Sequence, residues 1–229
     1  MRNTLIGLAV IILLGVGLAA LTSHIHPGSS STSSDASTQT PPPAPKKPPV
    51  SVAQAQTAFA QYQQGAVPAE MTVKNRGVIQ LQLYPKAAPK TVARIMQLCK
   101  EGFYNGILFH RVVPGFVVQA GDPNSKKVKG SAIVHLTADQ VMQQYQLGAT
   151  GSGQSIPFEK NSLDNIPGTI AMALSMPQSD TGDSQFFINL GNNTNLNGDY
   201  CVFGRIVKGM SVVKSIQQGD RIVSFTTGK

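Results

Sequence analysis

Residues 108–122, LFHRVVPGFVVQAGD, form an apolar, strand-like run with an arginine, Arg111, in its middle. Burying a guanidinium group costs free energy unless other groups neutralise its charge and accept hydrogen bonds from its five donors. Arg111 therefore either points to solvent or is retained for a function. The Pro-Gly pair at 114–115 interrupts the alternation of the run. Its two halves can then direct Arg111, Phe116 and Gln119 toward one patch.

The segments around this run indicate many short strands. The stretch 71–85 alternates polar and apolar residues around a turn-like KNRG at 74–77, which is typical of a β-hairpin. No strand–helix–strand alternation follows, so the pattern favours an antiparallel barrel or sandwich. The further strand-like runs are GTIAMAL at 168–174, SQFFINL at 184–190, YCVFGRIV at 200–207 and a last one near Ile222.

Helices are expected at four places. Lys90 and Thr91 begin an amphipathic helix that Gly102 stops, and another helix starts near Met210. Two Ser/Thr-x-x-Gln patterns predict capping boxes at the start of the other two helices. The first of these could pack on the domain or lie on a membrane. The capping boxes lie at Ser51–Gln54, for a helix that ends at Gly65, and at Thr137–Gln140, for a helix that ends near Gly148.

The amino-terminal part of the chain predicts an exported, tethered domain. Residues 5–21 form an uncharged apolar run of 17 residues behind Arg2, between the usual lengths of a signal-peptide core and a membrane span. No clear cleavage site follows, which favours a retained anchor with its amino terminus in the cytoplasm. Residues 27–50 are rich in Ser, Thr and then Pro, as in a disordered spacer. We divide the chain into a signal peptide or signal anchor at 1–24, a linker at 25–69 with a short helix near 51–64, and a globular domain at 70–229 with an insertion near 126–148.

Composition and charge argue against several function classes. The 229 residues carry a net charge of +8, but the basic residues are scattered, with short clusters only at 46–47 and 126–129. Clustered arginines and a stacking platform are lacking, so we expect no nucleic-acid partner. Cys99 and Cys201 fall in helical and strand patterns and are expected to be small buried side chains. In an oxidising compartment the two cysteines could instead form a disulfide, and the sequence does not decide between these alternatives.

Several motifs follow one another in the order and spacing of a known family. FYNGILFHRVVPGFVVQAGD, GTIAMA, SQFFINL and LNGDYCVFGRIVKGM, together with APKTV at 88–92, resemble the cyclophilin family of peptidyl-prolyl cis-trans isomerases. The resemblance covers about residues 71–225. It implies a mainly β fold, a closed eight-stranded antiparallel barrel capped by two helices, with the site on the outer face of the barrel.

Isomerisation of an X-Pro bond requires no nucleophile, metal or cofactor, and we expect none. The amide rotates over a barrier of about 18–20 kcal/mol because its nitrogen lone pair is delocalised into the carbonyl. A catalyst has only to bind the twisted amide better than the planar one. One fixed cationic donor can do this by bonding the pyramidal nitrogen, whose lone pair is available only in the twisted state.

The resemblance assigns roles to individual residues. Arg111 matches the catalytic arginine, and Gln119 and Gln185 match the amides that steady the peptide and Arg111. Ala173 and Leu174 match the segment whose backbone pairs with an extended substrate. Without the motifs, the aromatic residues in these apolar strands would be read as ordinary core. The residues that match walls of the proline pocket are Phe116, Val117, Phe187, Leu196 and Tyr200.

Some positions depart from the family pattern. Val117 stands where many members have methionine, and it makes a smaller wall. Asn195 and Tyr200 stand where cyclosporin-sensitive members have tryptophan and histidine, so we do not expect tight cyclosporin binding. His110 should point away from Arg111, because neighbours on a strand alternate, and the resemblance implies a structural role for it. The histidines at 24, 26 and 135 have no acidic or cysteine partners at metal-ligand spacing.

The sequence thus predicts a peptidyl-prolyl isomerase that assists the folding of extracytoplasmic proteins. We expect its partners to be proline-containing polypeptides and, through the N-terminal segment, the inner or plasma membrane, with the domain itself a monomer in the periplasm or cell envelope. A different class of function stays open. The same groove could serve a non-catalytic chaperone or envelope scaffold that holds proline-containing segments without turnover.

Overall fold

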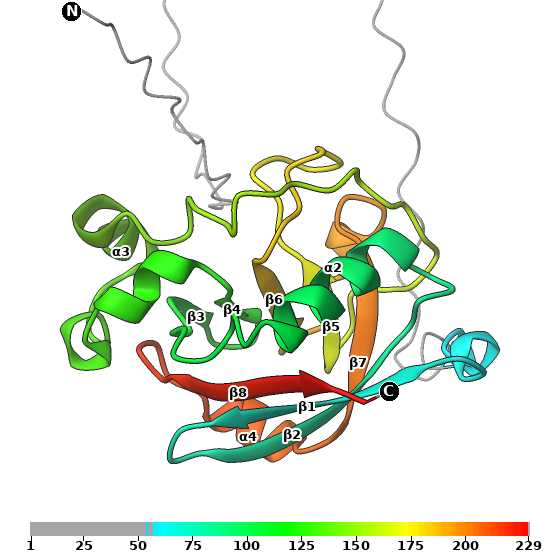
Figure 1. The fold of residues 1–229 in the computed structure, drawn as a ribbon, viewed down its shortest axis with the longest axis horizontal. Coiled ribbons are helices and arrows are strands. Elements are labelled where there is room, and N and C mark those ends of the chain that lie inside the picture. Colours follow the sequence, from blue (N-terminus) through cyan, green and yellow to red (C-terminus); the bar gives the residue numbers. More distant parts are fainter. Residues whose placement is uncertain (1–53, 55–56, 229) are drawn as a thin grey trace, which may run out of the picture.

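The computed structural model describes residue 54 and residues 57–228, which form a curled antiparallel sheet with helices against it (Figure 1). The spatial order of the strands is β3-β4-β6-β5-β7-β2-β1-β8, and each neighbouring pair is antiparallel. The mainly β character expected from the sequence is confirmed. The strands are β1 (Val67–Val73), β2 (Gly77–Leu83), β3 (Arg111–Val113), β4 (Val117–Ala120), β5 (Thr169–Met172), β6 (Phe186–Asn189), β7 (Val202–Lys208) and β8 (Ile222–Thr227).

The barrel is not closed, so the sequence-based expectation was wrong on this point. The edge strands β3 and β8 are not neighbours in the sheet, and an isolated bridge between Leu108 and Arg221 spans the gap. Around this bridge the Phe109 N–H bonds the Asp220 carbonyl and the Ile222 N–H bonds the Ile107 carbonyl, at 2.8 Å each, but residues 107–109 precede β3. The backbone N–H of Leu108 points away from β8 and bonds the hydroxyl of Ser125, at 3.0 Å. Because β3 has only three residues, the fold is a curled half-barrel.

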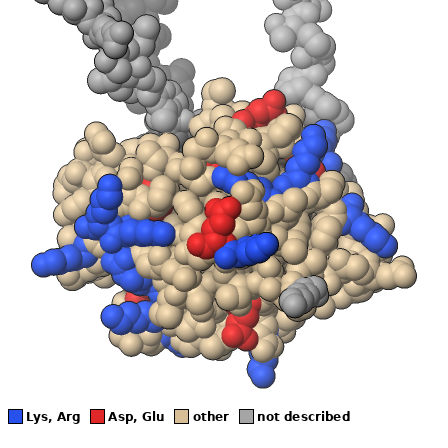
Figure 2. All heavy atoms as spheres, viewed as in Figure 1, with Lys and Arg blue, Asp and Glu red and all other residues tan. Residues whose placement is uncertain are grey.

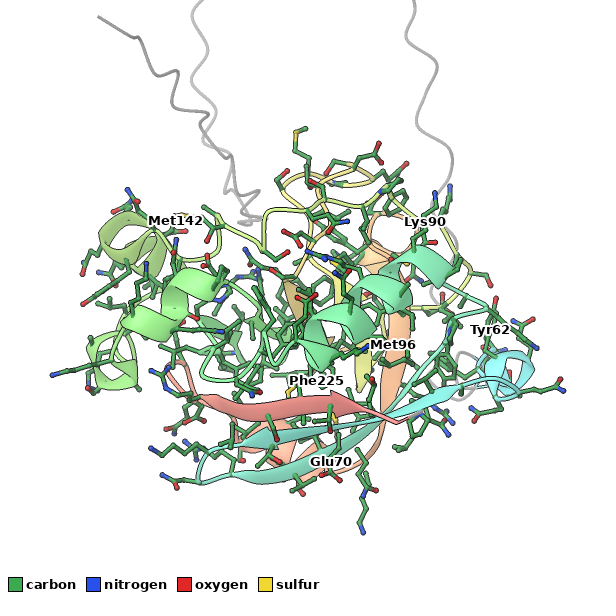
Figure 3. The ribbon with its side chains drawn as sticks, viewed as in Figure 1. Tyr62, Glu70, Lys90, Met96, Met142 and Phe225 are labelled. Atoms are coloured by element: carbon green, nitrogen blue, oxygen red, sulfur yellow. The ribbon has the colours of Figure 1, made fainter. Side chains whose placement is uncertain are left out.

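Three α-helices, rather than two, accompany the strands in the described part of the chain. α2 begins with a proline at its first turn and buries Val92, Ile95 and Leu98 in the main core. α2 also contacts β8, and Figure 3 shows Met96 and Phe225 between these two elements. α4 contacts β2, whereas α3 belongs to the insertion. The helices are α2 (Pro89–Lys100), α3 (Ala138–Tyr145) and α4 (Met210–Ser215), with short 3-10 helices η1 (Ala60–Tyr62), η2 (Pro123–Lys127), η3 (Gly130–Ala132) and η4 (Thr194–Leu196).

Two local predictions are confirmed by backbone geometry. β1 and β2 form a hairpin around the predicted turn, where Asn75 and Gly77 have φ angles of 61° and 127°. Asn and Gly adopt positive φ at lower cost than other residues. The second capping box is also present: the Thr137 side chain accepts from the Gln140 backbone, and the Gln140 side chain accepts from the Thr137 backbone. Local signals therefore fix the start of α3.

The insertion has a small core of its own. Leu108, Ile133, Val141 and Leu147 are buried together, apart from the main core. Gln218, just before β8, fastens this unit to the sheet, since its side-chain amide donates to the carbonyls of residues 133 and 136, at 2.7 Å each. The insertion is therefore a folded unit packed beside β3, not a loose loop.

The segment before β1 docks on the domain. Phe59 is only 1% exposed, its ring lies 5.5 Å from that of Tyr84, and the Arg205 guanidinium stands over its other side. The sequence left open whether this segment packs on the domain or lies on a membrane, and Phe59 decides for packing. The capping box at 51–54, the leader at 1–24 and most of the linker lie outside the described residues. Among residues 54 and 57–228, no helix is long and apolar enough to cross a membrane.

Both cysteines are buried free thiols. Burial raises the pKa of the Cys99 and Cys201 thiols to about 12. The Cys201 sulfur lies 3.9 Å from the Thr91 hydroxyl near the start of α2. Cys99 is on the same helix, about two turns further along. The prediction of small buried side chains is confirmed, and the two thiols are not joined in a disulfide.

The charged surface is mixed, and basic residues appear on both sides of the face that Figure 2 shows. Figure 2 shows several Lys and Arg side chains on the side that carries α3 and the β1–β2 turn. At that turn, Lys74, Arg76 and Arg221 line a hollow of about 460 Å³ together with Asp220, which pairs with Arg76 at 2.7 Å. Charged walls make this hollow unsuited to a proline ring.

Candidate active site

The apolar run at residues 108–122 contains a hairpin rather than one kinked strand. β3 and β4 are antiparallel, with Arg111 opposite Gln119, and the turn between them includes Gly115 at a φ of 73°. Residues directly opposite each other in an antiparallel pair lie on the same face of the sheet. The guanidinium carbon of Arg111 lies 5.6 Å from the centre of the Phe116 ring in the turn. The predicted grouping of Arg111, Phe116 and Gln119 is therefore present, in an ordinary hairpin register.

A chain of hydrogen bonds holds Arg111. Its guanidinium donates to the Gln119 side-chain oxygen at 3.3 Å, and the Gln119 amide donates to the Gln185 side-chain oxygen at 3.0 Å. The Gln185 amide in turn donates to the Thr150 carbonyl at 2.8 Å. Each amide has its oxygen and its nitrogen engaged, so the orientation of every member is fixed. Gln119 therefore bonds Arg111 directly, and Gln185 is linked to it through Gln119.

An apolar patch adjoins the arginine. Val117, Phe187 and Leu196 are buried in a cluster separate from the main core, with Phe116 and Tyr200 packed against it. Phe187 lies opposite Gln119 across the β4–β6 ladder, so it belongs to the same face as the arginine. The Tyr200 ring meets the Phe187 ring edge to face, at 5.6 Å and 80°. The side chains expected to form the pocket walls lie together.

Leu174 is the exception among the predicted site residues. Ala173 packs against the apolar patch, and its backbone N–H bonds the Gln185 carbonyl at 3.0 Å. Leu174 instead packs against the main core, near Gly182 and Ile156. The side chains of consecutive residues in an extended segment point to opposite sides. The Leu174 side chain is therefore not part of the patch, and the backbone role that the resemblance implies for Ala173 and Leu174 stays a prediction.

The site is electrostatically unusual because no carboxylate among the described residues is bonded to its cation. Burial lowers the pKa of the Arg111 guanidinium, while Tyr200 and Asp139 oppose that shift. Burial also raises the pKa of Tyr200, which Arg111 opposes. Arginine stays protonated near neutral pH despite such shifts. The arrangement presents a permanently charged donor at the border of an apolar surface.

His110 is buried away from this face, as expected. It is only 3% exposed, and a Cβ placed on Gly148 of the insertion would lie 3.4 Å from its Nε2. Burial lowers the pKa of His110 to about 4, and the Asp122 carboxylate opposes that shift. His110 is therefore neutral at pH 7. Its position under the insertion fits packing rather than proton transfer at the patch.

Several residues around the site could not be assigned from the sequence. Asn193 donates from its side chain to the Phe116 carbonyl at 2.9 Å and to the Asn189 side-chain oxygen at 2.6 Å, which holds the turn of the β3–β4 hairpin. Arg94 and Asp183 form a buried ion pair behind Gln185. Arg94 did leave a signal, because it falls on the apolar face of the predicted helix at 90–101. A charge at such a position requires a buried partner.

Comparisons with known proteins agree with this fold. The sequence profile of the family described as "Cyclophilin type peptidyl-prolyl cis-trans isomerase/CLD" matches residues 69–226. A probable peptidyl-prolyl cis-trans isomerase of Brucella suis is 35% identical over 172 residues, which cover 75% of this chain and 81% of that protein. The peptidyl-prolyl cis-trans isomerase of Helicobacter pylori is 39% identical over 158 residues, which cover 67% and 83%.

A solved structure supports the fold independently. The crystal structure of a cyclophilin type peptidyl-prolyl cis-trans isomerase of Cryptosporidium parvum matches with a TM-score of 0.57 and 20% identity, covering 72% of this chain and 98% of that one. The fold and the profile together define an isomerase domain. The chain belongs to the cyclophilin-type peptidyl-prolyl cis-trans isomerase family.

Proposed function

We propose that this protein isomerises X-Pro bonds by donating a hydrogen bond from Arg111 to the nitrogen of the twisted amide. The observation that carries the proposal is the placement of Arg111 over the Phe116 ring, bonded to Gln119 and to no carboxylate of residues 54 and 57–228. The substrate's proline ring would lie against Phe116, Val117, Phe187, Leu196 and Tyr200. No covalent bond forms or breaks, because the reaction is only a rotation about the amide.

The position of Arg111 favours the transition state over the ground state. In a planar amide the nitrogen lone pair is delocalised and accepts a hydrogen bond poorly. In the twisted amide it becomes an acceptor, so a donor fixed at that nitrogen stabilises only the twisted form. Partial burial strengthens the interaction, since a charge acts more strongly where water is excluded. The hydrogen bond to Gln119 removes the need to orient the guanidinium during each turnover.

Replacing Arg111 by alanine tests the proposal. Loss of one preorganised donor typically lowers turnover by about 10² to 10³. We expect Arg111→Ala to lower the isomerisation rate of an Ala-Pro peptide in this range, as measured by NMR exchange. Arg76→Ala, which removes an arginine at the β1–β2 turn, is the matched control and should leave the rate unchanged. Equal catalysis by Arg111→Ala and the wild type would refute the mechanism.

The substrates we propose are proline-containing segments of polypeptides outside the cytoplasm. The sequence supports this location with the apolar run at 5–21 behind Arg2 and with the spacer at 27–50. Mass spectrometry of the amino terminus, on protein taken from its native membrane fraction, distinguishes a retained anchor from a cleaved signal peptide. Recovery of the protein only from the cytoplasmic fraction would refute the proposed location.

A non-catalytic scaffold is the alternative function. It would use the same apolar patch to hold proline-containing segments, with no demand on Arg111. The dipeptide Ala-Pro, present when one of the similar structures was determined, is a suitable minimal ligand for comparing binding with turnover. Full rescue of a deletion phenotype by Arg111→Ala would favour the scaffold over the isomerase.

A further inference from the structure

A buried ion pair close to the site holds residues 152–154, which follow the insertion. Arg94 and Asp183 are 6% and 9% exposed, and the guanidinium donates to the carboxylate at 3.2 Å. The Ser152 hydroxyl bonds both of them. The other Asp183 oxygen accepts the backbone N–H groups of Gly153, at 2.9 Å, and Gln154, at 3.3 Å. Asp183 thus fixes the backbone of residues 152–154.

A second buried carboxylate fixes the other side of the same segment. Asp122 is fully buried and accepts the backbone N–H of Gly148 at 2.7 Å and that of Thr150 at 3.2 Å. It also accepts the Thr150 hydroxyl at 2.6 Å. Between the two carboxylates the Thr150 carbonyl points at Gln185, the last amide in the chain that begins at Arg111.

Asp183 acts on both partners of that last hydrogen bond. It holds the segment that presents the Thr150 carbonyl, and it lies two residues before Gln185 on the approach to β6. The fit is tight, because a Cβ placed on Gly151 would lie 2.3 Å from an Asp183 carboxylate oxygen. A shift of this carboxylate would therefore move the loop and the glutamine relative to each other. The effect would pass through Gln119 to the guanidinium.

We propose that the Arg94–Asp183 ion pair positions Arg111 for catalysis through the chain Thr150, Gln185 and Gln119. The proposal deepens the proposed function and rests on it. Neither member of the ion pair would touch the substrate. Their contribution is to hold the donor within the small tolerance that an oriented reaction requires.

The test is a double-mutant cycle on kcat. Asp183→Asn keeps the shape of the side chain and removes the charge. We expect it to lower kcat about three- to tenfold per folded molecule, with KM within about twofold, since the substrate contacts stay intact. In a Gln119→Ala background, which already breaks the chain, the same substitution should lower kcat by less than about 1.5-fold. Asp180→Asn, an exposed aspartate three residues away that caps the Phe158 backbone, is the matched control and should be silent.

A purely structural role gives different results. Equal fold-losses from Asp183→Asn in both backgrounds, or an unchanged kcat, would overturn the proposal. If Asp183→Asn does not fold, Ser152→Ala replaces it, because this variant keeps the ion pair and removes only the shared hydroxyl. We then expect about a twofold loss of kcat that again disappears in the Gln119→Ala background.

An NMR measurement separates failure of this proposal from failure of the proposed function. The side-chain amide protons of Gln185 and the guanidinium protons of Arg111 report the hydrogen-bond chain whether or not the protein turns over a substrate. We expect both sets to exchange with water faster in Asp183→Asn than in Asp180→Asn. Unchanged exchange would overturn the proposed positioning, whereas inactivity of the wild type would count against the isomerase only.

Discussion

Two arginines in this molecule occupy sheltered positions but are treated in opposite ways. The charge of Arg94 on α2 is paired with the Asp183 carboxylate. Its other donors bond the Ser152 hydroxyl and the side-chain oxygens of Gln97 and Gln154. Arg111 on β3 bonds the neutral side chain of Gln119 and stands over an aromatic ring. The first arginine is neutralised by its surroundings, and the second is held in place while its charge stays available.

This difference separates a structural charge from a functional one. A buried ion pair satisfies itself and has nothing left for a ligand. A cation oriented by neutral groups keeps its field for whatever enters the site, which is the condition for stabilising a transition state. The stability of the fold should therefore depend on Arg94 and activity on Arg111, apart from the positioning effect proposed above.

Removal of Arg94 should have the largest effect on stability. Arg94→Ala leaves the Asp183 carboxylate buried and unpaired, which typically costs about 3–5 kcal/mol. We expect a loss of this size in the free energy of unfolding, measured by urea denaturation at pH 7. Arg111→Ala should lower stability by less than about 1 kcal/mol, because the loss of one hydrogen bond to a neutral partner costs about that much.

A partly exposed arginine gives the control for this measurement. Arg76 pairs with Asp220 at 2.7 Å, but their side chains are 26% and 18% exposed. Pairs with access to water contribute about 0–1 kcal/mol, so Arg76→Ala should have a small effect. Similar losses from Arg94→Ala and Arg76→Ala would show that burial does not distinguish the two pairs, and the comparison would fail.

His110, the neighbour of Arg111, is a basic group that burial keeps neutral, unlike either arginine. Its pKa is lowered to about 4 from the usual 6.5, so the unfolded chain binds the proton more readily than the folded one. Stability is therefore complete above pH 6.5, falls as the pH drops and reaches its full loss below pH 4. For this shift the loss is about 3 kcal/mol. Asp122 and Arg111 are the charged groups that act on it.

The measurement is the free energy of unfolding between pH 7 and pH 4. Carboxylates also titrate near pH 4, so the wild type is compared with His110→Phe, which has no titrating ring. The informative quantity is the difference between the two proteins in the stability lost from pH 7 to pH 4. We expect the variant to lose less stability across this window. His135→Gln, at an exposed position in the insertion, should follow the wild type. Parallel curves for all three proteins would mean that His110 is not kept neutral by burial.

The sequence was sufficient for local structure and for the grouping of most residues of the candidate site. Alternating runs, the turn at 74–77, Gly102 and the Thr137–Gln140 capping box each depend on neighbours in the chain, and the structure agrees with all of them. The site residues on β3, β4 and β6 were found through motifs, which carry spatial information that periodicity alone does not.

What failed depended on contacts between distant segments. Barrel closure failed because β8 meets the segment before β3 at an isolated bridge, Leu108–Arg221, and does not pair with β3 itself, which no local pattern indicates. The resemblance gave Ala173 and Leu174 a backbone role, which stays a prediction, and it did not show that the Leu174 side chain packs against the main core. The Arg94–Asp183 pair joins residues 89 positions apart, and only the charge on the apolar helix face hinted at it.

The smallest effect we predict comes from making Arg111 resemble Arg94. Gln119→Glu would place a carboxylate where a neutral oxygen now accepts from the guanidinium at 3.3 Å. A partly buried pair formed in this way should raise the free energy of unfolding by up to about 1 kcal/mol. The same pairing engages the guanidinium and screens its charge, so kcat/KM should fall about fivefold, which equals about 1 kcal/mol of transition-state stabilisation. Urea denaturation and NMR exchange on an Ala-Pro peptide measure the two quantities on one sample. A gain in stability with no loss of activity would show that an arginine paired with a carboxylate catalyses as well as an unpaired one. Arg94 and Arg111 would then differ in position but not in the way their charge is used.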